Sequence, residues 1–163
     1  MSERQTAKTR RRARRVRRAR EFDAFVAGAA GRLLHAATLL TAETPGINPQ
    51  AQRLLTAALA RTYADWDRLR GEDPYDRTRR ELVSRFALSA WRHHKARGGI
   101  LARLGPQERL ILVLRLYEGV AEEQTAALIG LPVERVRAVC ARAVATMRRA
   151  PRPPPHARVE TAP

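Results

Sequence analysis

The sequence has a single cysteine, Cys140, among its 163 residues. An internal disulfide is therefore excluded, and a reducing cytoplasm suits the chain. Glycine-rich phosphate loops, G-x-S-x-G elbows and H-E-x-x-H zinc motifs are also missing. The adjacent His93 and His94 point to different sides of a helix and are poorly placed to share a metal, so we interpret them as its frayed, polar end. We expect no enzyme, no cofactor and no metal site, and we interpret Cys140 as a small core residue.

Long hydrophobic runs are missing as well. The apolar run Leu110–Leu114 lies between Arg109 and Arg115 and is far too short to cross a bilayer. The basic start of the chain is not followed by the apolar stretch of a secretory signal. We therefore expect a cytoplasmic protein with no membrane partner.

Acidic residues are scarce relative to basic ones. Sixteen Asp and Glu face 32 Lys and Arg, which gives a net charge of +16, and Lys8 and Lys95 are the only lysines. A balance this basic indicates a polyanionic partner, either nucleic acid or an anionic membrane surface. Arginine binds phosphates and guanines better than lysine does, because its planar guanidinium is bidentate. A bias toward arginine and alanine can also reflect a GC-rich genome.

The positive charge is concentrated at the N-terminus. Residues 1–20 carry ten basic side chains against one acid, Glu3, and Val16 is nearly their only large apolar side chain. Such a segment cannot bury a core of its own. We predict a basic disordered arm over residues 1–20 that contacts phosphates without reading sequence.

Beyond the arm, apolar residues recur at helical spacing, and no stretch alternates with the period of a strand. A first helix is predicted from about Glu21 to Thr41. A second begins with Asn48 as N-cap and Pro49 as its first residue, and a third runs from about Tyr75 to Lys95. The fold class is therefore all-α.

The pair Gly98-Gly99 is the only flexible joint in the middle of the chain. We place a domain boundary there, between a helical domain at residues 21–97 and a second one at residues 100–149. Residues 150–163 form a proline-rich tail without a packing pattern.

The stretch from Ala121 to Arg149 has the pattern of two helices joined by a tight turn. Gly130 supplies the left-handed backbone that such a turn requires, and Pro132 begins the next helix. One face of that helix is apolar: Val136, Val139, Cys140, Ala143 and Met147. Three cations lie outside it: Arg135, Arg137 and Arg142. This pattern is typical of a helix-turn-helix that offers cations to DNA; the alternative is a helical hairpin with solvated arginines.

Two blocks of the sequence resemble one family. The block Leu101–Arg148 is similar to region 4 of extracytoplasmic-function (ECF) sigma factors, initiation subunits of bacterial RNA polymerase, and most resembles the actinobacterial SigE-like branch. The segments between Phe22 and His94 resemble region 2 of that family. The resemblance implies a three-helix region 2-like domain, a helix-turn-helix region 4-like domain, and a transcription initiation factor that brings core RNA polymerase to promoter DNA. An anti-sigma factor is a candidate partner.

The resemblance also implies site residues. It places the helix that begins near Val133 in the major groove of the −35 element and turns the third helix toward the −10 element. The implied DNA-binding residues are Arg135, Arg137, Ala138 and Arg142 in the former, and Arg79, Arg80, Arg85 and Arg92 in the latter. Tyr63, Trp66 and Tyr75 are expected near the melted strand, with core packing as the alternative for Trp66 and for Trp91.

The chain also departs from the family pattern. Arg53, Thr56 and Ala57 stand where the family has carboxylates that bind a basic helix of the polymerase, and Ser84 replaces an asparagine of the −10-reading helix. The linker between the two blocks is short. A second hypothesis is therefore a sigma-like DNA-binding regulator that no longer binds core polymerase normally. A third is a basic interaction protein that uses its arm on acidic partners or membrane surfaces.

Overall fold

The computed structural model describes residues 3–95 and 97–149, with side chains from residue 5 onward. In this part of the chain the fold is all-α, as predicted, apart from one isolated bridge between Thr44 and Ile47. The six α-helices are α1 (Glu3–Thr41), α2 (Pro49–Ala64), α3 (Pro74–Leu88), α4 (Pro106–Leu112), α5 (Glu122–Ile129) and α6 (Val133–Arg148). Three short turns of other helix types connect them: η1 (Trp66–Arg68), η2 (Ala90–His93) and the π-helical η3 (Val113–Tyr117). The predicted proline-rich tail lies outside the described residues.

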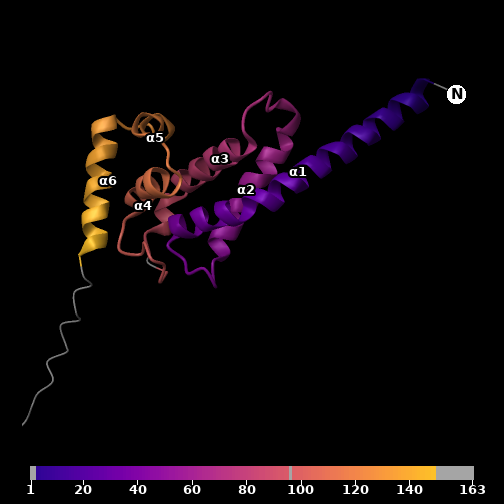
Figure 1. The fold of residues 1–163 in the computed structure, drawn as a ribbon. Helices are drawn as coiled ribbons and strands as arrows, with labels where there is room; N and C mark the ends of the chain where they lie inside the picture. The colour runs from indigo at the N-terminus through magenta and orange to yellow at the C-terminus, as the bar shows by residue number, and fades with distance from the viewer. Residues whose placement is uncertain (1–2, 96, 150–163) are drawn as a thin grey trace, which may run out of the picture.

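Helix α1 differs most from the prediction. It begins at Glu3 rather than near Glu21, so residues 3–20 are helical and not a disordered arm. Arginine and alanine, which dominate this segment, are both strong helix formers. At its base Arg18 donates to Asp67 at 3.2 Å and to the backbone carbonyl of Tyr63, which fixes α1 to the end of α2. The first half of α1 therefore projects from the body as a rod (Figure 1).

The second half of α1 is a core helix. Leu33, Ala37 and Leu40 are at most 1% exposed, and α1 packs against α2, α3 and α4. By length and hydropathy alone α1 would also pass as a membrane span. Its apolar face is already covered by protein, so a structural role in the core accounts for that hydropathy.

Helix α2 begins as predicted, with Asn48 at the N-cap and Pro49 in the first turn. The side chain of Asn48 does not cap the helix, however, and donates to Thr38 at 2.9 Å. The buried carboxylate of Glu43 caps the helix instead, and accepts hydrogen bonds from the backbone amides of Gln50 at 3.1 Å and Ala51 at 2.9 Å. A negative charge at the positive end of the helix dipole is favourable.

Helix α3 ends at Leu88, earlier than the predicted Lys95, because Ser89 caps it and the chain tightens into η2. The prediction of a frayed, polar end is wrong for His93, which is 3% exposed. Its ring stacks on Phe86 at 5.1 Å, and its carbonyl accepts from the guanidinium of Arg109, which is itself buried. Burial, followed by the nearby charge of Arg109, lowers the pKa of His93.

One core joins the two halves of the chain. Leu40, Leu82 and Phe86 belong to the same buried cluster as Leu110, Leu114 and Ala143. The joint between the halves is held in place rather than flexible: Gly99 is buried, and its amide donates to the Ala42 carbonyl at 2.9 Å. A β-carbon at Gly99 would lie 2.5 Å from the Ala42 carbonyl carbon, so only glycine fits this approach.

Candidate nucleic-acid interface

The helix-turn-helix has the predicted geometry. Gly130 ends α5 in the left-handed conformation, with φ 71° and ψ 36°. The amide of Leu131 donates to the carbonyl of Ala126 at 3.1 Å, which closes the turn. Pro132 is the N-cap of α6 rather than its first helical residue, and its carbonyl accepts from Val136. The turn therefore sets α6 across α5 at the end of the molecule farthest from the α1 rod (Figure 1).

Helix α6 has one buried and one exposed face. Val136, Val139 and Ala143 are fully buried, while Cys140 and Met147 are half-buried against the core. Burial raises the pKa of the Cys140 thiol, as expected for a residue that serves packing. The other face carries the four predicted DNA-binding residues of this helix, all exposed: Arg135, Arg137, Ala138 and Arg142.

Two of these cations are oriented by carboxylates of neighbouring helices. Arg137 contacts Glu122 of α5 at 2.8 Å, and Arg142 contacts Glu108 of α4 at 3.1 Å. The hydrogen bond from Arg137 to Glu122 raises the pKa of that guanidinium. Both arginines remain more than half exposed, with side-chain exposures of 62% and 58%. Exposed ion pairs are weak, so a phosphate can compete for either cation.

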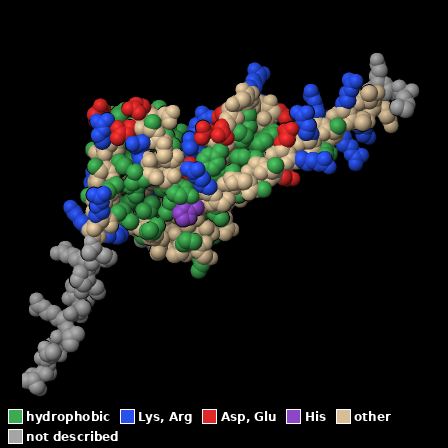
Figure 2. All heavy atoms as spheres, in the orientation of Figure 1, with side chains coloured by type: hydrophobic (Ala, Val, Ile, Leu, Met, Phe, Trp, Pro, Cys, Tyr) green, Lys and Arg blue, Asp and Glu red, His purple; other side chains and the backbone are tan. Residues whose placement is uncertain are grey.

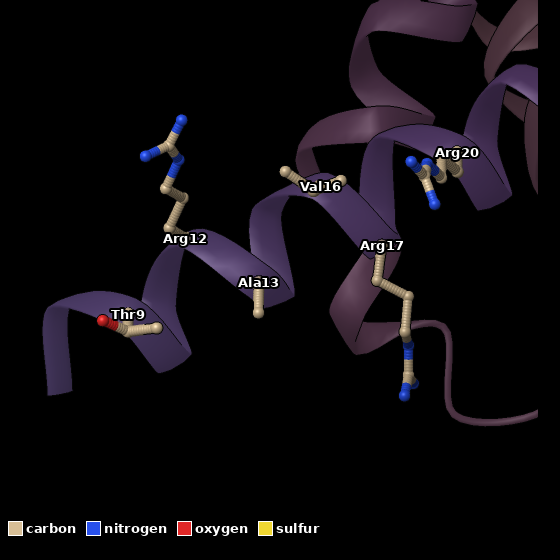
Figure 3. Close-up of a pocket in the computed structure, with 6 residues that line it drawn as sticks. All are labelled: Thr9, Arg12, Ala13, Val16, Arg17 and Arg20. Atoms are coloured by element: carbon tan, nitrogen blue, oxygen red, sulfur yellow. The ribbon is translucent and has the colours of Figure 1, made fainter. Parts of the chain in front are cut away.

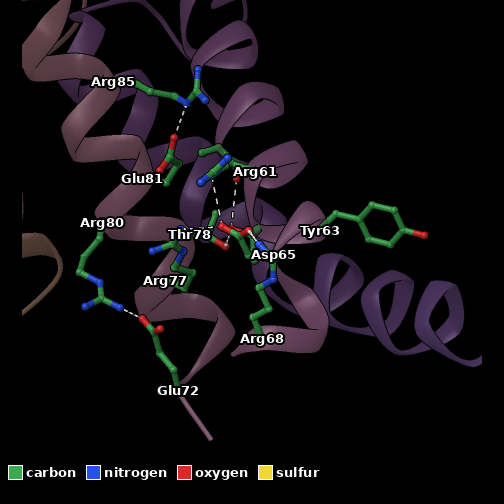
Figure 4. Close-up of polar contacts among 12 residues, drawn as sticks. Arg61, Tyr63, Asp65, Arg68, Glu72, Arg77, Thr78, Arg80, Glu81 and Arg85 are labelled. Carbon is green, nitrogen blue, oxygen red and sulfur yellow. Dashed lines mark hydrogen bonds and ion pairs between the residues drawn. The ribbon is translucent and has the colours of Figure 1, made fainter. Parts of the chain in front are cut away.

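The predicted cations of α3 are more strongly engaged. Arg80 pairs with Glu72, and Arg85 contacts Glu81 at 2.7 Å (Figure 4). Arg79 contacts Asp76 at 2.9 Å and Glu118 at 3.4 Å, and only 18% of its side chain is exposed. Arg92 lies beyond α3, with its guanidinium 4.8 Å from the centre of the Trp91 ring. Acidic neighbours thus offset much of the positive charge expected on α3.

Glu118 was not predicted from the sequence, yet it connects the two halves. Its side chain is 1% exposed and accepts hydrogen bonds from the Tyr75 hydroxyl at 2.9 and 3.0 Å. Arg32 of α1 lies 3.7 Å away and Arg79 of α3 lies 3.4 Å away. Burial, followed by the hydrogen bond to Glu118, raises the pKa of Tyr75. A lone acid four residues after the apolar run Leu110–Leu114 was the only signal available in the sequence.

The aromatic residues expected near a melted strand are divided between two places. Trp66 and Tyr63 pack on Phe22, with ring centres 5.2 and 4.8 Å away. Tyr75 lies elsewhere, against the cluster that contains Leu33. Packing against Phe22 therefore accounts for much of the environment of the Trp66 ring. Trp91, in contrast, is 67% exposed and is not a core residue.

The three residues at the expected polymerase contact lie on α2. Arg53 and Thr56 are exposed, and Ala57 is half-buried. Helix α2 contains no acidic residue, so its outer surface carries no carboxylate of its own. Across the described chain, no group of three or more His, Cys, Asp or Glu is arranged to hold a metal ion.

Comparison with known proteins supports the helix-turn-helix interpretation. Residues 100–149 match the family described as Sigma-70, region 4. The chain is 28% identical over 123 residues to the RNA polymerase sigma-E factor of Streptomyces coelicolor, covering 60% of this chain and 70% of that protein. The sigma-E factor of Streptomyces antibioticus is 28% identical over 132 residues, covering 64% and 73% respectively. No solved structure matches the chain significantly. The region 4 match and the similarity to sigma-E factors together support a sigma factor of the sigma-70 family, of the extracytoplasmic-function type.

Proposed function

We propose that this sigma factor directs core RNA polymerase to promoters by inserting α6 into the major groove of the −35 element. The observation that carries the proposal is the exposed face of α6, which presents Arg135, Arg137 and Arg142 opposite a fully buried stripe. Guanidinium groups bind phosphates and the edge of guanine. Ala138 lies among them, and its small side chain lets the helix approach the floor of the groove.

In this proposal α3 faces the −10 element with Arg79, Arg80, Arg85 and Arg92. Three of these cations are paired with acids in the free protein, so DNA must displace Asp76, Glu72 or Glu81 to reach them. The division into domains at residues 21–97 and 100–149 is part of the proposal. It requires the shared core to open when both elements are bound. The site of action is the cytoplasm, and an anti-sigma factor is a further proposed partner.

The alternative function is a sigma-like regulator that binds DNA without normal polymerase binding. The exposed surface of α2 favours it, because Arg53 and Thr56 stand where the family presents carboxylates to a basic polymerase helix. Charge reversal at such a contact costs several kcal/mol if the partner is unchanged.

Fluorescence anisotropy at about 0.15 M salt can measure binding of the purified chain to core RNA polymerase from the same source. This measurement separates the two functions. Sub-micromolar binding that a housekeeping sigma factor competes away establishes an initiation factor. Duplex binding without competed polymerase binding establishes the regulator. Arg53→Glu is the informative variant, because it restores a carboxylate to α2 and strengthens polymerase binding if the partner surface is basic. Gln52→Glu, at the neighbouring exposed position, is its matched control.

The DNA-binding residues require a separate test. Replacing Arg135, Arg137 and Arg142 together with alanine removes three cations from the exposed face of α6. We expect loss of sequence preference between promoter and scrambled duplexes, with folding intact because the buried stripe is untouched. An unchanged preference for the promoter duplex would mean that α6 is not the surface that recognises the DNA sequence.

A further inference from the structure

The projecting half of α1 has no packing role that explains its charge. Between Gln5 and Arg20 it carries nine cations and no acid. Residues 5–17 are all exposed, and the cations up to Arg15 make no ion pair within the described part of the chain. Figure 2 shows Lys and Arg side chains along the length of this extension, well away from the apolar body. Like charges at this density repel, so the segment is adapted to a polyanion outside the protein.

The cations are distributed around the helix in a way that discriminates between partners. At about 100° per residue, Lys8 and the arginines from Arg10 to Arg17 occupy an arc of roughly 220°. The remaining strip holds Thr6, Thr9, Ala13 and Val16, with Arg20 at its base. Figure 3 shows this strip, with Arg12 and Arg17 projecting on opposite sides of it.

A bilayer surface meets only one face of a helix and requires a broad apolar face, as in amphipathic membrane helices. Val16, 46% exposed, is the only apolar side chain larger than alanine that this strip offers to a bilayer. A groove of duplex DNA differs, because phosphates line both of its walls. A helix of about 10–12 Å diameter fits a major groove about 12 Å wide, where a cation arc wider than half a turn is useful.

The base of the extension provides a second indication. A notch of about 1030 Å³ lies between α1 and η1, and Arg10, Arg11, Arg14 and Arg15 line its α1 side. Asp67 and Glu21 are its acids, and both are occupied: Asp67 pairs with Arg18, and Glu21 with Arg17 at 3.0 Å. The acids therefore hold the rod at its base and leave the outer cations of the notch open to phosphate.

We propose that residues 5–20 are a second DNA-binding element, a rigid basic helix that binds the phosphates of a duplex groove without reading sequence. It lies at the opposite end of the molecule from α6 (Figure 1), so it contacts DNA away from the segment that α6 binds. The inference rests on the proposed DNA-binding function but does not require polymerase binding. About 16 residues give a rod ~24 Å long, which spans roughly two-thirds of a helical turn of DNA.

The test compares the full chain with variants on two duplexes of unrelated sequence, across a series of salt concentrations. Replacing Arg11, Arg14 and Arg15 with glutamine should lower the affinity for both duplexes equally, by at least ~10-fold at about 0.15 M salt. It should also reduce the slope of log affinity against log salt concentration by ~2–3. The control removes the same charge from exposed body positions, as R70Q/K95Q/R103Q. This control should change the slope by less than ~1.

Ala13→Pro distinguishes a helix from a charged tail. It keeps every cation but breaks the rod in its middle. We expect weaker binding to both duplexes and partial flattening of the slope; a wild-type slope would overturn the helical part of the proposal. Loss of binding to phosphatidylglycerol vesicles by the arginine variant, with duplex binding unchanged, would assign the rod to a membrane surface instead. Failure of the α6 proposal shows separately, as unchanged sequence preference in the R135A/R137A/R142A variant.

Discussion

The hydroxyl of Tyr75, at the start of α3, donates to the carboxylate of Glu118, directly after η3, at 2.9 and 3.0 Å. These residues lie in different halves of the chain. The carboxylate is shielded from water and is also contacted by Arg79 and Arg32. The contact therefore fixes the position of α3 relative to residues 100–149, which match region 4. Removing it should destabilise both parts.

Glu118→Gln is predicted to destabilise the fold. The substitution keeps the shape of the side chain but leaves the largely buried Arg79 without its buried counter-charge. Breaking such a buried pair costs about 3–5 kcal/mol. Urea denaturation followed by circular dichroism measures this loss as a lower transition midpoint.

Two variants define how the Glu118 result is interpreted. Tyr75→Phe removes a hydrogen bond but no charge, and should cost only about 1 kcal/mol. Glu123→Gln changes an exposed acid of α5 and should be close to neutral. If Glu118→Gln were as mild as Glu123→Gln, the carboxylate would not be coupling the two halves.

The helix-turn-helix was predictable because its signals are local. Gly130 and the apolar spacing from Val136 to Ala143 are set by backbone conformation and helical period, and both appear in the structure as expected. The start of α2 at Pro49 was predictable for the same reason. Its capping acid was not, because Glu43 reaches the helix from outside it.

Features that depend on contacts between distant segments were missed. The sequence near Arg18 contains nothing that identifies Asp67 and Tyr63 as partners, so the helical start of α1 was predicted as disordered. His93 was assigned to a polar helix end because its burial depends on Phe86 and on Arg109 of α4. Local propensity cannot report such packing.

His93 should make stability depend on pH. Burial and the surrounding charges of Arg109, Arg97 and Arg92 lower its pKa in the folded state, with Glu43 opposing them. The unfolded chain therefore binds the proton more readily. The contribution of neutral His93 to the free energy of unfolding is fully present above about pH 7. It falls as the pH drops below about 6.5, by up to ~1.4 kcal/mol per pH unit.

Urea titrations between about pH 5.5 and 7.5 span the range in which an unperturbed histidine titrates, and they measure this slope. His93→Gln should flatten it, because the titrating group is gone. His94→Gln removes an exposed neighbour and should leave it intact. A slope that survived His93→Gln would assign the pH dependence to another group.

The close approach of Gly99 to the end of α1 predicts a sensitive position in the linker. In Gly99→Ala the new methyl group would meet the Ala42 carbonyl carbon and the Glu43 oxygen at 2.5 Å, and backbone cannot move aside easily. We expect a loss of about 1–3 kcal/mol. Gly46→Ala is the control, because nothing lies within 4 Å of its added carbon. Equal thermal midpoints for the two variants would show that the linker is free of α1.

Gly130 differs from Gly99 because its constraint is conformational rather than steric. A β-carbon added at either Gly130 or Gly28 would have no neighbouring atom within 4 Å, but only Gly130 has a positive φ. Gly130→Ala should therefore cost about 1–2 kcal/mol, and Gly130→Val more, because a β-branched residue resists this conformation. Gly28→Ala, in an exposed stretch of α1, should instead stabilise the fold by up to about 1 kcal/mol. Opposite shifts of the thermal midpoint, with weaker duplex binding only for the Gly130 variants, would tie the orientation of α6 to this turn. A shift of the same sign in both would remove the special role of Gly130.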